Sequence, residues 1–419
     1  MSQLEVKDSP YAALKLPDFR KLLLGRLFVT LAVQIQGLAV GWQVYELTKS
    51  PLVLGCIGLA EALPSLGVAL YAGHIADVHD RTKIALIAVF GLFLSMIGLT
   101  LGSQFMSGTP LVVLIFSVIA FSGIARGFYG PAVFGIASDV VPRPLLANSA
   151  AWNSTSWQGS AMLGPVLGGF LYVGIGGAWT YGIATALLTL SLGIFLTLKN
   201  KSQRIINRDV SVIANIKEGL QFVFSNQIIL GAMALDLFAV LFGGAVALLP
   251  VFSAEIFHYG PQALGFLRAA PPLGAMLTAG ILAHLPIKSH AGRIFMSCVA
   301  GFGLCIIGFG LSKNYFVSLF FLTLSGMLDC VGVCIRGTIY QLLTPDDMKG
   351  RVASVNSMFI GSSNEIGEFE SGVAARFMGL VPSVVFGGTM TLLVVLFTAF
   401  KAPKLRDLHL QNLYLKETK

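Results

Sequence analysis

Charged side chains lie inside long apolar stretches of this sequence, where a charge is costly. They are Glu61, Arg126, Asp236, Arg268, Asp329, Arg336, Glu365, Glu368 and Glu370. A charge at such a position must find a partner or water, so each of these residues is a candidate functional residue. A carboxylate removed from water can also take up and release a proton as its exposure changes. The chemistry that these residues suggest is proton coupling.

Four of the carboxylates are candidates for carrying the proton. They are Glu61, Asp236, Glu365 and Glu368. Glu365 and Glu368 are three residues apart and share one helix face, whereas Glu370 points elsewhere. The alternative is that the carboxylates are permanently paired with the arginines of the same stretches and serve helix packing.

Other side chains at similar depth are candidates for contact with a substrate. They are Gln34, Arg126, Tyr129, Asn153, Trp157, Arg268, Asp329, Arg336 and Asn364. Asp329 and Arg336 are two helical turns apart, so they share a face and are expected to line one cavity. The competing interpretation is that such polar groups bind one helix to the next.

The elements that must position these residues are membrane-spanning helices. The chain is 55% hydrophobic and 11% charged, with a mean hydropathy of +0.80. Residues 84–125, 178–198 and 379–400 contain no charged side chain, and the runs lack the alternation of a membrane barrel. We predict an all-α integral membrane protein with twelve spans, near 20–47, 52–76, 82–103, 110–138, 145–172, 177–198, 227–253, 261–285, 292–311, 315–342, 350–378 and 380–400.

The positive charges follow the topology of a membrane protein. Of 28 lysines and arginines, only Lys49 and Lys313 fall in odd-numbered loops. This is the positive-inside distribution, and it predicts that both termini are cytoplasmic. The net charge of +8 is therefore a topology signal, and we expect no nucleic-acid partner.

Two short segments of the first half have echoes in the second. Residues 73–77 (Gly-His-Ile-Ala-Asp) correspond to residues 280–284 (Gly-Ile-Leu-Ala-His), and an eleven-residue Pro-to-Asn interval follows both Pro142 and Pro345. Such echoes favour an ancient duplication. We expect a six-helix bundle over 1–198, a cytoplasmic connector with an amphipathic helix over 199–226, a second six-helix bundle over 227–400 and a cytoplasmic tail over 401–419.

The first of these segments carries a family resemblance. Residues 73–83 (Gly-His-Ile-Ala-Asp-Val-His-Asp-Arg-Thr-Lys) resemble the loop between spans two and three of the major facilitator superfamily, Gly-x-Leu-Ala-Asp-Arg-x-Gly-Arg-Lys. Val78 replaces the usual Arg, and Asp80 the usual Gly. The stretch Gln341-x-x-x-Pro345-x-x-x-x-Gly350-Arg351-Val352 is similar to the macrolide-efflux and enterobactin-exporter branch, as are residues 179–182 and 265–275.

The resemblance implies the major facilitator fold, with two pseudo-symmetric bundles and a central cavity that opens to each side in turn. It also implies a cytoplasmic gate, to which Gly73, Asp77, Arg81 and Lys83 would belong. Gly350 and Arg351 would be its partner at the start of span eleven. The alternative for Arg81 and Lys83 is that they are only positive-inside anchors.

The implied function is secondary active export of an amphipathic small molecule, drug-like or siderophore-like, in exchange for protons across a bacterial-type inner membrane. The alternatives are a transporter of lysophospholipid or another lipid, and a membrane sensor that does not transport. The sequence contains no nucleotide-binding loop and no His-Glu-x-x-His motif, so we expect neither a primary pump nor an enzyme. The five cysteines lie within predicted helices, and we expect no cofactor, no metal and a monomer.

Overall fold

The chain is helical throughout almost all of the part that the structure describes. The computed structural model describes residues 9–198, 212–285, 287, 289–345 and 348–409, without the side chains at 70, 74, 77, 212–216, 354 and 362. Within these ranges there is no β-strand, and ten of the described helices are long and apolar enough to cross a membrane. The prediction of an all-α membrane fold is confirmed.

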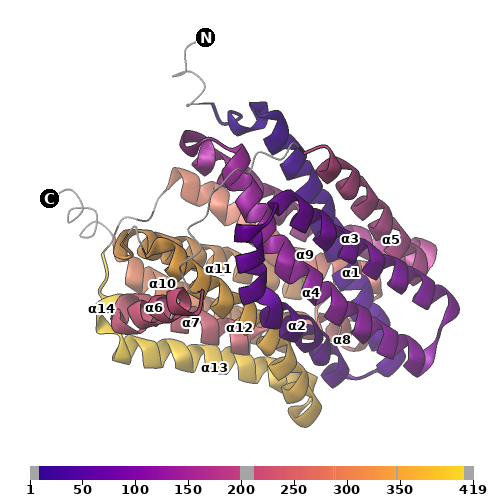
Figure 1. Ribbon diagram of the computed structural model, residues 1–419. Helices are drawn as coiled ribbons and strands as arrows, with labels where there is room; N and C mark the ends of the chain where they lie inside the picture. Colours follow the sequence, from indigo (N-terminus) through magenta and orange to yellow (C-terminus); the bar gives the residue numbers. More distant parts are fainter. Residues whose placement is uncertain (1–8, 199–211, 286, 288, 346–347, 410–419) are drawn as a thin grey trace. The chain divides into compact units, whose positions relative to one another are not determined.

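The first half of the described chain forms five long helices (Figure 1). They are α1 (Pro17–Thr48), α2 (Pro51–Val78), α3 (Arg81–Phe105), α4 (Gly108–Val140) and α5 (Leu146–Leu196). α5 is interrupted at Gly176, whose φ of 81° lies in the region that favours glycine. Before the break, the Tyr172 hydroxyl donates to Glu46 of α1 at 2.8 Å, and after it the Ser191 hydroxyl donates to the Gly25 carbonyl at 3.0 Å. The chain therefore reverses at Gly176, and α5 contains predicted spans five and six.

The second half of the described chain contains the remaining long helices. They are α7 (Gln227–Gly243), α9 (Pro261–His284), α10 (Ala291–Leu311), α11 (Tyr315–Leu343), α12 (Lys349–Met378) and α13 (Leu380–Lys401). The predicted span over 227–253 is not one continuous helix, because Gly244 leaves the helical region with ψ 53°. The chain then continues through short turns, η3 (Ala245–Leu248), α8 (Leu249–Val251) and the π-helical turn η4 (Phe252–Ile256).

The ten apolar helices and the twelve predicted spans describe the same elements. α5 counts once among the ten although it reverses at Gly176, and α12, which carries Glu365, Glu368 and Glu370, is not among the ten. A span that is too polar for lipid on every side must have protein or water against part of its surface. We therefore expect the polar face of α12 to contact protein or water rather than lipid.

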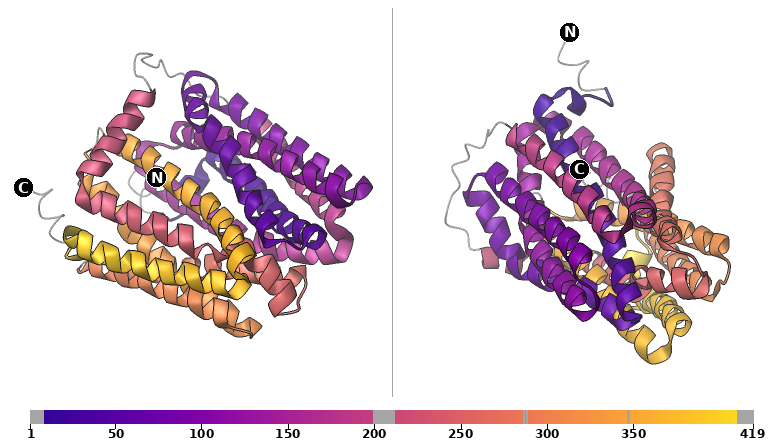
Figure 2. Two further views of the ribbon diagram at one scale, coloured as in Figure 1. Left: turned by 90° about the horizontal axis from the view of Figure 1, so that it is seen from below. Right: turned by 90° about the vertical axis from the view of Figure 1, so that its right-hand side faces the viewer.

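The helices form two compact units. The first comprises Met1–Lys49, Ala60–Arg208 and Tyr259–Gly265, and the second comprises Ser50–Leu59, Asp209–His258 and Phe266–Lys419. In the first unit α1 packs along α5, and α3 packs against both α4 and α5. In the second unit α10 packs between α11 and α13, and α7 packs on α13, which is yellow in Figure 2. Leu235, Phe295 and Ile335 form the centre of this second packing, with at most 2% of each residue exposed.

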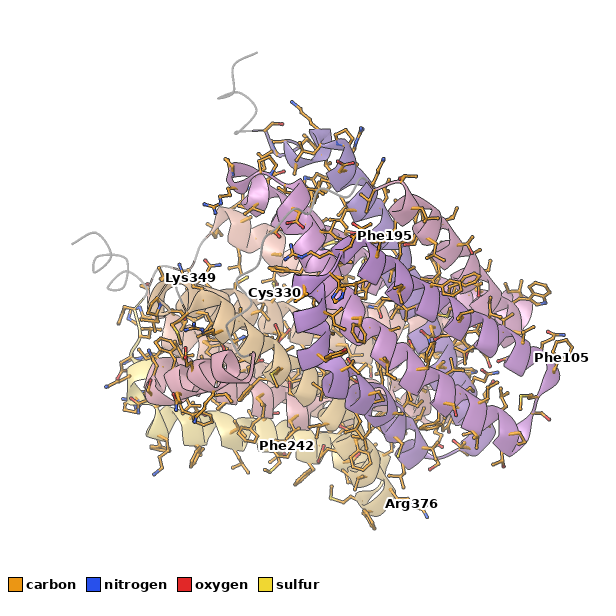
Figure 3. All side chains as sticks on the ribbon, viewed as in Figure 1. Phe105, Phe195, Phe242, Cys330, Lys349 and Arg376 are labelled. Atoms are coloured by element: carbon orange, nitrogen blue, oxygen red, sulfur yellow. The ribbon has the colours of Figure 1, made fainter. Side chains whose placement is uncertain are left out.

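Large apolar side chains are exposed on the helices, as expected where a surface meets lipid. Phe105 at the end of α3 is 80% exposed and points away from the ribbon in Figure 3, and Phe134 of α4 is 79% exposed. A water-soluble monomer rarely exposes large apolar patches. These side chains fit a chain that lies in hydrocarbon.

The connector contributes a helix, α6 (Val212–Ser225), that packs against α12 and α7. Val223 is fully buried in the same apolar cluster as Phe295, whereas Phe224 is 60% exposed. The Arg351 guanidinium at the start of α12 donates to the Glu218 carboxylate at 2.7 Å. α6 is thus attached to the second unit by both an apolar contact and an ion pair.

The end of the described chain binds to the start of α10. Leu405 and Leu408 are buried in the cluster around Phe295, and the Gly292 amide donates to the Leu408 carbonyl at 3.3 Å. The Asp407 carboxylate accepts from Arg293 at 3.2 Å and from Arg406 at 3.1 Å. Residues 402–408 are therefore held on the second unit by packing and by charge.

The ion pairs of Asp407 predict that this attachment depends on pH. Hydrogen bonds from Arg406 and then from Arg293 hold the pKa of Asp407 below its ordinary value. A carboxyl group whose native pKa is lowered stabilises the native state above its unfolded pKa, about 4, and the stabilisation is lost as the pH falls through the lowered native value. We expect hydrogen exchange of residues 290–294, corrected for intrinsic rates, to be faster in Asp407→Asn than in the wild type at pH 7. Equal protection of the two proteins at pH 7 would show that the ion pairs do not hold the segment.

Candidate functional site

Each unit contains an ion pair between two helices. In the first unit, the Arg126 guanidinium of α4 pairs with the Glu61 carboxylate of α2. Gly123, one turn before Arg126, lies directly against the Glu61 carbonyl, where a β-carbon has no room. An added β-carbon at Gly127, one turn later, would lie 2.6 Å from Val68 of α2. These two glycines bring the helix backbones close together and so place the two charges in contact.

The crossing at Gly123 predicts a large difference between two glycines of α4. Replacing Gly123 with Leu is expected to lower the free energy of unfolding by about 1–3 kcal/mol, because the Glu61 carbonyl occupies the space. Gly130→Leu is the matched control, since nothing lies within 4 Å of an added β-carbon there. Thermal unfolding in detergent compares the two variants. Equal losses of stability would show that the α2–α4 crossing is not the cause.

In the second unit, the Arg336 guanidinium of α11 pairs with the Asp236 carboxylate of α7. This pair is deeper than the one in the first unit, because only 5% of Arg336 and 9% of Asp236 is exposed. Two opposite charges at this depth neutralise each other where water is scarce. Arg336 therefore lies inside the bundle of the second unit, on the same helix as Asp329 but in a different environment.

Asp329 lines a small cavity next to this pair. The cavity has a volume of about 20 Å³, and its walls come from α7, α10 and α11. Asp236 and Asp329 lie on its lining together with apolar side chains, among them Phe295, Val299 and Phe302. Asp329 itself is exposed, whereas Asp236 is buried. The cavity thus has one carboxylate on the surface of the unit and one in its interior.

The glutamates of α12 are half-buried at a close helix contact. An added β-carbon at Gly58 would lie 2.7 Å from a Glu368 carboxylate oxygen, and one at Gly55 would lie 2.8 Å from the Glu368 carbonyl. The Glu368 charge also acts on the guanidinium of Arg268 in α9, which is half-buried. Glu365 is half-buried one turn earlier, and Asn364 is exposed. Charges of opposite sign on α9 and α12 therefore act on each other in this part of the second unit.

The polar candidates of the first unit are distributed between its interior and its surface. The Gln34 side chain of α1 lies against Gly164 of α5. The Tyr129 ring packs edge-on against Phe195, with centroids 6.4 Å apart, and its hydroxyl is buried. Asn153 is half-buried with its carbonyl oxygen inside, whereas Trp157 is 52% exposed. Trp157 is the candidate in this unit whose ring is most available to a ligand.

The predicted gate segment contains a buried arginine in the first unit. The Arg81 side chain is 9% exposed, and its Nη1 donates to both carboxylate oxygens of Asp139, at 3.0 and 2.9 Å. Its Nε donates to the Ala76 carbonyl at 3.0 Å. Lys83, two residues later in the first turn of α3, is exposed. Arg81 thus joins the end of α2, the start of α3 and the end of α4, which a surface anchor would not do.

The other gate candidates are less constrained. The Asp77 side chain lies outside the described residues, and an added β-carbon at Gly73 would meet nothing within 4 Å. Gly350 is exposed in the first turn of α12, and Arg351 binds Glu218 of α6. The role of these residues as a gate stays a prediction.

Two acidic partners, Asp139 and Glu218, were not among the residues selected from the sequence. Asp139 lies in the last turn of α4, where the negative end of the helix dipole opposes a carboxylate. That unfavourable position was a usable signal, because it requires a cationic neighbour. Glu218 gave no comparable signal, since it lies in a connector with many charges.

The arrangement described above is that of a transporter with the major facilitator fold. Among solved structures, a POT family transporter in complex with 5-aminolevulinic acid matches with a TM-score of 0.75 and 12% identity, covering 92% of this chain and 96% of its own. A D-xylose–proton symporter matches with a TM-score of 0.70 and 14% identity, covering 94% and 98%. At these identities the likeness shows the fold alone.

The family is shown by the sequence itself. The model of the transmembrane secretion effector family matches residues 8–416, and the chain belongs to this family of the major facilitator superfamily. The enterobactin exporter EntS of Shigella boydii serotype 4 (strain Sb227) is 27% identical over 340 residues, 80% of each chain. The prediction of a major facilitator transporter that resembles the macrolide-efflux and enterobactin-exporter branch is confirmed.

Proposed function

We propose that this transporter exports an amphipathic small molecule, drug-like or siderophore-like, in exchange for protons. The observation that carries the proposal is the family match over residues 8–416, together with a relative named as an exporter of enterobactin. The chain acts as a carrier rather than as an enzyme. It works in a bacterial inner membrane as a monomer, with both termini in the cytoplasm, the orientation that the positive-inside distribution favours.

The paired charges supply a coupling mechanism. When a proton binds the carboxylate of a buried pair, the carboxyl group becomes neutral and the arginine loses its ionic partner. Where the ion pair differs in strength between the inward-facing and the outward-facing orientation, its loss changes the free-energy difference between the two orientations. Glu61, Asp236, Glu365 and Glu368 are the candidate carriers. Asp236 has the strongest structural support, because it is the most deeply buried of the four and is paired with Arg336.

Purified protein in proteoliposomes tests this function. We expect a pH gradient to drive accumulation of a fluorescent amphipathic cation or of a catecholate siderophore, and we expect dissipation of the gradient by a protonophore to stop it. Accumulation of lysophospholipid instead would favour the lipid transporter. Ligand binding without flux under any gradient would contradict transport and favour a sensor.

A further inference from the structure

The cavity beside the Asp236–Arg336 pair has a size that suits one water molecule. Its volume is about 20 Å³, and a cavity needs on the order of 10–15 Å³ to hold a water. A purely apolar cavity of this size stays empty, because a water needs two or more polar partners. Here Asp236 of α7 and Asp329 of α11 both belong to the lining, so the cavity has polar side chains that can hold a water.

The two carboxylates differ in access. Asp329 is exposed on its unit, while only 9% of Asp236 is exposed. A charged carboxylate facing hydrocarbon is very unfavourable, so the exposed side of Asp329 must meet water. Asp236 is buried, and the cavity that it shares with Asp329 is otherwise lined largely by apolar side chains, among them Phe295, Val299 and Phe302 of α10. A proton that reaches Asp236 therefore needs an intermediate group.

We propose that Asp329 and one water in this cavity form the route by which protons reach and leave Asp236. The inference rests on the proposed function, since it requires that transport be coupled to protons. A proton from the aqueous side binds the Asp329 carboxylate. The carboxyl group donates this proton to the cavity water, and the same water donates one of its own to Asp236. Asp236 becomes neutral, and Asp329 and the water return to their starting forms.

The neighbouring groups suit this route. Arg336 on α11 pairs with the charged form of Asp236. The Arg336 charge therefore loses this ionic partner only while Asp236 carries the proton. Cys298 of α10 lines the cavity, and Cys330 of α11, labelled in Figure 3, follows Asp329 in the chain. Thiols are weak hydrogen-bonding groups, so neither competes strongly for the water. The two carboxylates are the charged groups on the cavity lining among the residues that the structure describes.

Asp329→Asn tests the route, because it keeps the size of the side chain and removes proton transfer. We expect the rate of uptake driven by a pH gradient to fall at least about tenfold, since a positioned proton-transfer group contributes factors of this order or more. Asp329→Glu should restore most of the driven rate with a shifted pH profile, which a purely structural role would not produce.

Filling the cavity provides a second test that leaves every charge in place. We expect Cys298→Leu to slow driven uptake by displacing the water, while Cys298→Ala, which keeps the space open, should retain it. The thermal unfolding midpoint of each variant in detergent checks that it is folded.

The outcomes separate the two proposals. If wild-type uptake does not respond to a pH gradient, the proposed proton coupling fails. If the wild type responds and both Asp329→Asn and Cys298→Leu are driven at the wild-type rate, the route through Asp329 is wrong while the proposed function stands.

Discussion

Replacing Arg336 with Met is expected to lower the free energy of unfolding by about 3–5 kcal/mol and to abolish driven transport. Met fills similar space without the charge, so the Asp236 carboxylate stays buried without its ionic partner. Only 9% of Asp236 is exposed, and bulk water therefore cannot replace the guanidinium. Thermal or denaturant unfolding in detergent measures the stability, and proteoliposome uptake measures the transport.

The double variant Asp236→Leu with Arg336→Met separates stability from function. Removing both charges leaves no uncompensated group, so we expect most of the lost stability to return. Driven transport should remain absent, because neither the proton carrier nor its partner is present. A single variant that is as stable as the wild type would contradict the pairing of Asp236 with Arg336.

Arg81 and Lys83 lie two residues apart, and their replacement by Met should have very different effects. Arg81→Met is expected to cost about 3–5 kcal/mol, because Asp139 loses its partner and the Ala76 carbonyl loses a donor. Lys83→Met should change stability by no more than about 0.5 kcal/mol, since Lys83 is exposed. The same unfolding measurement applied to both variants compares a buried charge with an exposed one.

Uptake assays test whether Arg81→Met and Lys83→Met also differ in their effect on transport. We expect Arg81→Met to lose transport even when it is assayed well below its unfolding temperature, and Lys83→Met to retain most of it. Equal effects of the two substitutions would support the view that both residues are only topological anchors.

The helical architecture was predictable because each span has its own local signal. Apolar length, charge-free runs and the positions of lysine and arginine determine where a helix lies in a membrane. The span predicted over 227–253 corresponds to the candidate membrane span Gln227–Ile256, within which Gly244 leaves the helical conformation. A single glycine in an apolar run does not predict a break, because many other glycines of this chain lie inside continuous helices.

The candidate site was predictable in its residue types but not in its pairings. The cost of burying a charge pointed to Glu61, Arg126, Asp236 and Arg336 from sequence alone. Which carboxylate meets which arginine depends on how helices far apart in sequence pack, as Asp236 and Arg336 show across one hundred residues. The cavity shared by Asp236 and Asp329 has no signal in the sequence, because it is a property of packing among α7, α10 and α11.

The reversal at Gly176 has a consequence for how this protein enters the membrane. The two halves of α5 are joined by a single residue outside the helical conformation, Gly176. No loop therefore separates the first half from the second on the far side of the bilayer. We therefore expect the two segments to be inserted together, as a helical hairpin, so that the pair of helices rather than the single helix is the unit of insertion at this point of the chain.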